Sequence, residues 1–256
     1  MMEFIDSHVH LMDRKYNQDL PQVLANARAA GVSAMVNIGY DLDSSRRAVA
    51  MAKEEDDLYA VVGIHPHDAV TCTPEALAEL EQLAGEQKVV AIGEMGLDYY
   101  RNLSPKDAQQ QSFRDQLRLA KKLNKPIVIH DRDAHGDVMD ILREEKIPEA
   151  GGVLHCYSGS WEMARQAMKM GLYISIAGPV TFNNARRLQD IAKLMPLSHL
   201  LIETDCPYLT PEPYRGRRNE PAYVVEVAKM IASVKGVPLE EVARATTMNA
   251  KRLFGI

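Results

Sequence analysis

Three side chains that can bind metal alternate in the first hydrophobic stretch of the chain, FIDSHVH at residues 4–10. In an extended strand the side chains at i, i+2 and i+4 lie on one face, so Asp6, His8 and His10 could point the same way. Imidazole nitrogens bind ions such as zinc, and carboxylates bind harder cations or bridge two ions. An edge strand that carries two histidines by chance would have the same pattern. The other strands are therefore needed to distinguish a metal site from chance.

Similar residues stand at the ends of most other apolar stretches. Eight strands are expected, over residues 3–8, 33–39, 59–65, 89–94, 126–130, 152–156, 172–178 and 200–205. Six of them finish at or beside a residue that can bind metal or move protons: His8 with His10, His65, Glu94, His130, His155, and Glu203 with Asp205. A single position would most simply be a buried core histidine, but so regular a placement favours one shared site.

The stretches between these strands carry helix signals. Thr73 and Ser104 each precede a proline, the usual order of an N-cap and a first helical residue, which predicts helices over 73–84 and 104–124. Strands that alternate with helices predict a parallel sheet. The sequence therefore predicts an α/β protein with one TIM-barrel domain, a (β/α)₈ barrel over residues 1–256. An open, doubly wound sheet is the alternative architecture.

A barrel of this kind would gather the site residues, because the carboxyl ends of all its strands meet at one mouth. Four histidines and two carboxylates suffice for two divalent cations with open positions for water: His8, His10, His130, His155, Glu94 and Asp205. Such ions lower the pKa of bound water towards about 7 and polarise a phosphoryl or carbonyl oxygen. This donor set accepts Mg, Mn, Zn, Co or Fe.

Composition limits the class of protein. The chain has 256 residues and a net charge of −5, with 46% hydrophobic residues and no apolar run near the roughly 20 residues that cross a bilayer. Its start lacks the pattern of a signal peptide, so a cytoplasmic protein is expected. Cys72, Cys156 and Cys206 form no CxxC pair and fit a reducing compartment, where the last two are expected to be packing thiols.

Seven motifs in order give the chain a family resemblance: FIDSHVH, GIHPHDA, AIGEMGLDYYR, IVIHDRDAH, LHCYSG, LLIETDCPYL and RRNEPAYV. They resemble the motif series of the TatD family of metal-dependent deoxyribonucleases, which are barrels of the metallo-dependent hydrolase type. The resemblance covers the chain from residue 4 to the closing NAKRLFGI.

The resemblance implies a role for each site residue. His8, His10 and Asp205 would hold one ion, and Glu94 would bridge it to a second. His130 and His155 would complete the second ion. Asp205 would also act as the general base, His65 would contact the substrate or assist the leaving group, and Glu203 would have an accessory role beside Asp205 on the same strand face.

The implied activity is hydrolysis of DNA as a nuclease, a 3′→5′ exonuclease that prefers single strands, through activation of water by two metals. An amide or ester hydrolase on the same site, such as a D-aminoacyl-tRNA deacylase, is the alternative enzyme class. The bridging ligand is Glu94, where many amidases use a carboxylated lysine, which favours the nuclease. A metal-binding scaffold without activity would have no need of open coordination positions.

Residues in the loops beyond the strands are candidates for substrate contact. Tyr99, Tyr100 and Arg101 follow the strand of Glu94, and stacking of a base on an aromatic ring is worth roughly 1–3 kcal/mol. Arg132 could bind phosphate or pair with Asp131 or Asp133. Arg218 lies in an arginine-rich loop after the eighth strand, where barrels often bind phosphate, although Glu220 offers it an internal partner.

Overall fold

The computed structural model describes residues 2–256. Its eight strands follow one another in chain order in a single sheet. They are β1 Phe4–Val9, β2 Val32–Ile38, β3 Leu58–Val62, β4 Val89–Asp98, β5 Ile127–Arg132, β6 Gly152–Leu154, β7 Leu172–Ile176 and β8 Leu200–Ile202. Between and after them lie α1 Leu20–Ala29, α2 Leu42–Glu54, α3 Pro74–Ala84, α4 Lys106–Leu123, α5 His135–Glu145, α6 Trp161–Lys169, α7 Arg186–Leu194, α8 Val224–Lys235 and α9 Leu239–Phe254.

This succession of elements confirms the predicted (β/α)₈ barrel. The first and last strands are neighbours, because Val9 at the end of β1 forms a parallel bridge with Cys206 just beyond β8. A doubly wound sheet would leave its outer strands unpaired, so the alternative architecture is wrong. The described chain divides into two compact units: a terminal unit of residues 2–37 and 174–256, and a central unit of residues 38–173.

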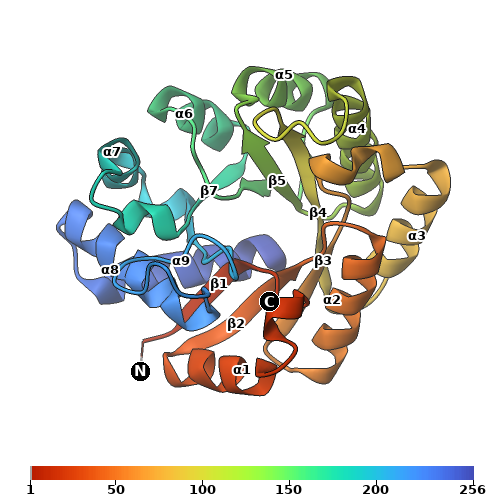
Figure 1. Ribbon diagram of the computed structural model, residues 1–256. Coiled ribbons are helices and arrows are strands. Elements are labelled where there is room, and N and C mark those ends of the chain that lie inside the picture. Colours follow the sequence, from red (N-terminus) through yellow and green to blue (C-terminus); the bar gives the residue numbers. More distant parts are fainter. Residues whose placement is uncertain (1) are drawn as a thin grey trace. The chain divides into compact units, whose positions relative to one another are not determined.

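Both ends of the chain build the terminal unit. Strand β1 pairs in parallel with β2, and β7 pairs with β8. All six residues of β1 are buried, as expected for a strand covered on both faces. Helices α8 and α9 pack against β1 and β8 (Figure 1). Helix α9 begins after Pro238, ends at Gly255 in the left-handed conformation, and buries Val242, Leu253 and Phe254.

The central unit contains β3, β4, β5 and β6, whose neighbouring strands pair in parallel where β3 meets β4, β4 meets β5 and β5 meets β6. Helix α3 begins as predicted, because the Thr73 side chain accepts the Ala76 amide at its start. Helix α4 does not, since the Ser104 hydroxyl donates to the His67 carbonyl and Pro105 occupies the N-cap position. Ser104 therefore links two loops of this unit instead of capping a helix.

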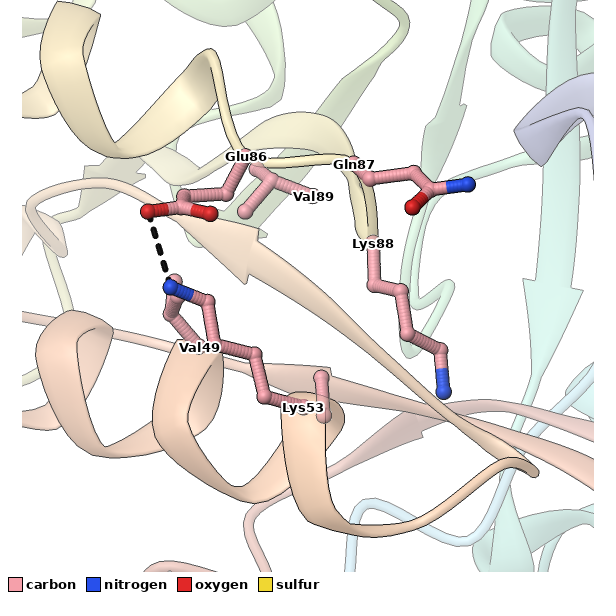
Figure 2. A pocket seen from close by; sticks show the side chains of 7 residues that line it. Val49, Lys53, Glu86, Gln87, Lys88 and Val89 are labelled. Atoms are coloured by element: carbon pink, nitrogen blue, oxygen red, sulfur yellow. Dashed lines mark ion pairs between the residues drawn. The ribbon is translucent and has the colours of Figure 1, made fainter.

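A cleft of about 220 Å³ in the central unit lies at the start of β4 (Figure 2). Lys53 of α2 pairs with Glu86 across it at 2.8 Å. Lys88 donates to the carbonyl oxygens of Glu55 at 2.5 Å and Asp56 at 3.0 Å, just beyond the end of α2. These polar groups form ion pairs and hydrogen bonds with one another at the amino end of β4. The predicted site residue Glu94 lies further along the strand, outside this cleft.

The ends of the strands differ most from the prediction. Strand β4 runs to Asp98, four residues beyond its predicted end at Glu94, while β8 ends at Ile202, three residues before its predicted end. Residues 2–256 contain no helix that combines the length and the apolar character needed to cross a membrane.

Candidate metal centre

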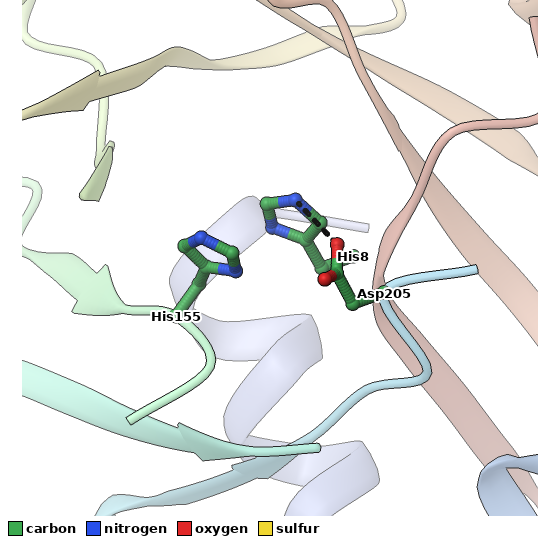
Figure 3. A group of neighbouring side chains, drawn as sticks. All are labelled: His8, His155 and Asp205. Atoms are coloured by element: carbon green, nitrogen blue, oxygen red, sulfur yellow. Dashed lines mark ion pairs between the residues drawn. The ribbon is translucent and has the colours of Figure 1, made fainter. Parts of the chain in front are cut away.

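The terminal unit brings three of the predicted donors together. The Nε2 atoms of His8 and His10 lie 3.2 Å apart. Asp205 Oδ1 lies 3.7 Å from Nε2 of His8 and 3.4 Å from Nε2 of His10. Figure 3 draws the pair of His8 with Asp205, together with His155 of the central unit. His8 and His10 are buried and Asp205 is partly exposed, so the three donor atoms form a compact triangle that is open to solvent at the carboxylate.

Main-chain hydrogen bonds hold this triangle together. The Asp205 amide donates to the His8 carbonyl at 3.0 Å, and the His10 amide donates to the Cys206 carbonyl at 2.9 Å. Asp205 itself has a φ of 55°, a left-handed conformation rare outside glycine and asparagine. The loop after β8 is thus fastened alongside β1, which places the carboxylate of Asp205 beside both imidazoles.

Asp6 serves this arrangement without joining the donors. Its carboxylate accepts the Thr204 amide at 2.9 Å and the Thr204 hydroxyl at 2.6 Å, and also the His8 amide at 3.3 Å. Burial raises the pKa of this carboxyl well above its ordinary value, although the hydrogen bonds oppose the shift. Asp6 was not among the six predicted ligands, and its oxygens bind the loop after β8.

The sequence predicted that Glu203 and Asp205 share a strand face. The structure shows that they do not. Strand β8 ends at Ile202, so both acidic residues lie in the loop beyond it and strand alternation does not apply. Glu203 is nevertheless almost fully buried, which leaves an accessory role open to test. Cys206 is buried, as expected for a packing thiol.

The central unit gathers a second group of donors around Glu94. Glu94 Oε1 lies 2.7 Å from His155 Nε2, 2.8 Å from His130 Nδ1 and 3.6 Å from His65 Nε2. The facing nitrogens of His130 and His155 are 3.3 Å apart. Gly96 allows β5 to approach at this point, because a Cβ there, at a φ of 136°, would collide with the His130 carbonyl.

Both groups have the chemistry and spacing of metal ligands. Four ligands placed tetrahedrally at about 2.0–2.1 Å from a zinc ion are about 3.3 Å from one another. The His8–His10 and His130–His155 nitrogen pairs lie at 3.2 Å and 3.3 Å. Neutral imidazoles that face one another with carboxylate oxygens at the same point form a donor set suited to a divalent cation. The residues present therefore fit the metal that the sequence predicted.

His65 differs from the other imidazoles of the central unit. Its Nδ1 accepts the His67 amide at 3.0 Å, which leaves the proton of the neutral ring on Nε2, facing Glu94. Burial lowers the pKa of His65 well below its ordinary value and outweighs the nearby Glu94 charge, so the ring is neutral. In this state His65 Nε2 is a hydrogen-bond donor, although its position would also suit a ligand.

Asp98 and His67 belong to the same cluster and were not among the predicted site residues. Asp98 Oδ2 lies 2.8 Å from Nε2 of His67 and 3.2 Å from Nε2 of His130. Burial opposes ionisation of Asp98, but hydrogen bonds from His130, the Arg101 amide and His67 outweigh it and lower its pKa. For His130, burial lowers the pKa, but hydrogen bonds to Asp98 and Glu94 outweigh it and raise the pKa. The sequence carried one signal, since Asp98 follows Glu94 by four residues and lies on the same face of a longer strand.

The candidates for substrate contact on the central unit fall into two groups. The Arg132 guanidinium lies 4.0 Å from the centre of the Tyr100 ring, and Tyr100 is 62% exposed. Among residues 2–256, Arg132 forms no ion pair with a carboxylate. Asp131 and Asp133, its predicted partners, are therefore not paired with it. Tyr99 instead donates to Asp137 at 2.6 Å and carries Lys106 over its ring.

The two remaining arginines also differ. The Arg218 guanidinium contacts Asp19 at 2.7 Å and Glu220 at 3.0 Å, and lies over the ring of Tyr16. These hydrogen bonds raise its pKa further, so the side chain is committed to internal ion pairs. Arg101 is exposed, and only its main-chain amide is fixed, by Asp98.

Comparison with known proteins identifies the family. The family model described as TatD related DNase matches residues 5–255. The chain belongs to the TatD family. The uncharacterized metal-dependent hydrolase YabD of Bacillus subtilis is 51% identical, with 98% of each chain covered. The 3′-5′ ssDNA/RNA exonuclease TatD of Cronobacter sakazakii is 40% identical, with 97% of each chain covered.

Solved structures agree with this family assignment. The TatD homolog YJJV of Escherichia coli K12 superposes with a TM-score of 0.94 at 30% identity, covering 99% of this chain and 98% of its own. The phosphotriesterase homology protein of Escherichia coli reaches a TM-score of 0.61 at 13% identity over 95% of this chain and 98% of its own, a likeness of fold alone. The TatD chain described here is therefore a metal-dependent hydrolase with a TIM-barrel fold.

Proposed function

We propose that the protein is a nuclease that hydrolyses single-stranded DNA from the 3′ end with the help of two divalent cations. The observation that carries the proposal is the convergence of imidazole and carboxylate donors in each unit, His8, His10 and Asp205 in one and Glu94, His130 and His155 in the other. The carboxyl ends of the strands of a (β/α)₈ barrel meet at one mouth, which supports a single centre. The name of the Cronobacter sakazakii relative supports the substrate.

These contacts support the predicted ligand roles. In the proposal, His8, His10 and Asp205 hold one cation, His130 and His155 hold the other, and Glu94 contributes to both. When bound, such cations neutralise the charge of a phosphodiester and favour deprotonation of water at neutral pH. Their positive charge also gives an acidic protein, of net charge −5, a local attraction for a polyanion.

The chain's own residues supply the proton transfer. Asp205 has a partly exposed carboxylate, 14% accessible, which can accept a proton from the attacking water as general base. His65 keeps its proton on Nε2 and can donate a hydrogen bond to a phosphoryl oxygen or to the leaving oxygen. We assign Glu203 an accessory role in the loop beside Asp205.

The exposed pair of Tyr100 and Arg132 supports a nucleotide as the substrate. An arginine without a carboxylate partner binds phosphate in a bidentate manner, and an exposed tyrosine ring stacks on any base. Tyr100 follows β4, which carries Glu94, and Arg132 is the last residue of β5, which carries His130. We include Arg101 in this surface, and we exclude Tyr99 and Arg218 because the structure engages them elsewhere.

The test uses single-stranded DNA labelled at either the 3′ or the 5′ end. With Mg²⁺ or Mn²⁺, 5′-labelled DNA should give a ladder of shortening products, while 3′-labelled DNA should release labelled mononucleotide at once. An RNA strand of the same sequence measures the preference between the two polymers. Hydrolysis of an aminoacyl ester without degradation of DNA would overturn the proposal in favour of an ester or amide hydrolase.

A further inference from the structure

The carboxylate of Asp98 is held in one orientation. Its Oδ1 accepts the Arg101 amide at 2.7 Å, its own amide donates to the Gln109 side chain at 2.8 Å, and the side chain is buried. Its Oδ2 is shared by His67 and His130. The Gln109 contact fixes the main chain of Asp98, and the contacts of Oδ1 and Oδ2 limit rotation of its side chain, so Oδ2 is presented to the His130 ring at a fixed point.

Asp98 favours one of the two tautomers of His130. An ionised carboxylate only accepts hydrogen bonds, so Asp98, at 3.2 Å, favours a neutral ring with its proton on Nε2, whereas Glu94, at 2.8 Å, favours the proton on Nδ1. In the Nε2-protonated form, the lone pair of Nδ1 points towards Glu94 Oε1 and His155 Nε2, 2.8 Å and 3.3 Å away. That lone pair is what a cation needs from an imidazole.

We propose that Asp98 is a positioning residue that fixes the tautomer and orientation of His130 and so increases the affinity of the central unit for a divalent cation. The inference rests on the cation-binding role of His130 in the proposed function, and it does not depend on the substrate. Carboxylate partners of ligand histidines typically contribute 10–100-fold to metal affinity.

The experiment measures Zn²⁺ binding to the metal-free full-length protein, by competition with a chromophoric chelator. Asp98→Asn keeps the size of the side chain, but its amide group can donate to Nε2 and favour the other tautomer. We expect the Zn²⁺ affinity of the central unit to fall about 10–100-fold in this variant. In ¹⁵N NMR of the metal-free proteins, the Nε2-protonated fraction of the His130 ring should be larger in the wild type than in Asp98→Asn.

A control variant separates this role from general effects of charge and structure. Asp131→Asn removes a carboxylate from the same region, where Asp131 binds His135 Nδ1 at 2.8 Å. This variant should keep the Zn²⁺ affinity within about threefold, a change below 1 kcal/mol by the tenfold-per-1.4 kcal/mol relation.

The possible results test two separate claims, the positioning role of Asp98 and the proposed function. Wild-type affinity in Asp98→Asn, or an equal loss in Asp131→Asn, would overturn the positioning role alone. Failure of the wild type to bind Zn²⁺ would overturn the proposed function, including the role of His130. If Asp98→Asn does not fold, the ¹⁵N spectrum of the Zn²⁺-loaded wild type decides, because a His130 ring without a proton on Nε2 contradicts the inference.

Discussion

The terminal and central units position their donors by different means. In the terminal unit the carboxylate of Asp6 binds the main chain and hydroxyl of Thr204, and main-chain bonds place Asp205 beside His8. In the central unit the carboxylate of Asp98 contacts the imidazole of His130 directly. Substitutions behind the donors should therefore affect folding in the terminal unit and affinity for the cation in the central unit.

The largest effect is expected at Asp205, the one proposed ligand that is also a proposed base. Asp205→Asn should lower kcat by about 10²–10⁴-fold, the usual contribution of a general base. Zinc analysis should still find metal, because His8 and His10 remain. Single-turnover hydrolysis of labelled DNA measures the loss.

Asp13→Asn is the matched control for this variant, since Asp13 is an aspartate of the same unit whose carboxylate binds the Lys15 amide and the Tyr208 hydroxyl. Its rate should stay within about twofold of the wild type, well under the 1.4 kcal/mol that changes a rate tenfold. A near-normal rate in Asp205→Asn would reject its role as base.

Removing the donors of one unit tests whether each unit holds an ion of its own. The double variant His8→Ala with His10→Ala should lose one of the two proposed ions and keep the ion of the central unit. His155→Ala should have the converse effect, because it removes a donor that lies 2.7 Å from Glu94. Elemental analysis after equilibration with Mn²⁺ gives the number of ions per chain. Equal metal content in the wild type and both variants would contradict the claim that each unit holds an ion of its own.

The support behind the terminal donors is expected to act on stability. Asp6→Ala leaves the buried amide and hydroxyl of Thr204 without their acceptor, which costs about 1–3 kcal/mol for each unsatisfied group. Urea unfolding of the metal-free protein measures this loss. Asp98→Asn keeps its volume and an acceptor oxygen, so a larger loss of stability there than in Asp6→Ala would reverse the distinction between the units.

The smallest effect separates two arginines that the sequence could not distinguish. Arg132→Ala should raise KM about tenfold, which corresponds to about 1.4 kcal/mol and matches the loss of a charged hydrogen bond. Arg218→Ala should leave KM unchanged, because its guanidinium is bound to Asp19 and Glu220. Steady-state hydrolysis of DNA gives both values, and a rise in KM for Arg218→Ala alone would exchange the two roles.

The alternation of strand and helix signals was enough to predict every strand of the barrel. The ends of strands were not predictable, because main-chain pairing with a neighbour extends β4 to Asp98 and stops β8 at Ile202. That difference hid Asp98 and gave Glu203 a wrong strand face. The partner of Arg218 lies 199 positions away in sequence, at Asp19, a contact that local patterns do not encode.

The order in which the ribosome makes the chain gives the two donor groups different histories. The terminal unit is built from both ends of the chain, with His8 near its start and Asp205 near its end. At about 5–20 residues per second, Asp205 emerges on the order of ten seconds or more after His8. All the donors of the central unit have been synthesised by then. In the proposed function, a nascent chain can therefore complete this donor group and bind an ion there first. His8 and His10 gain the carboxylate of Asp205 only later.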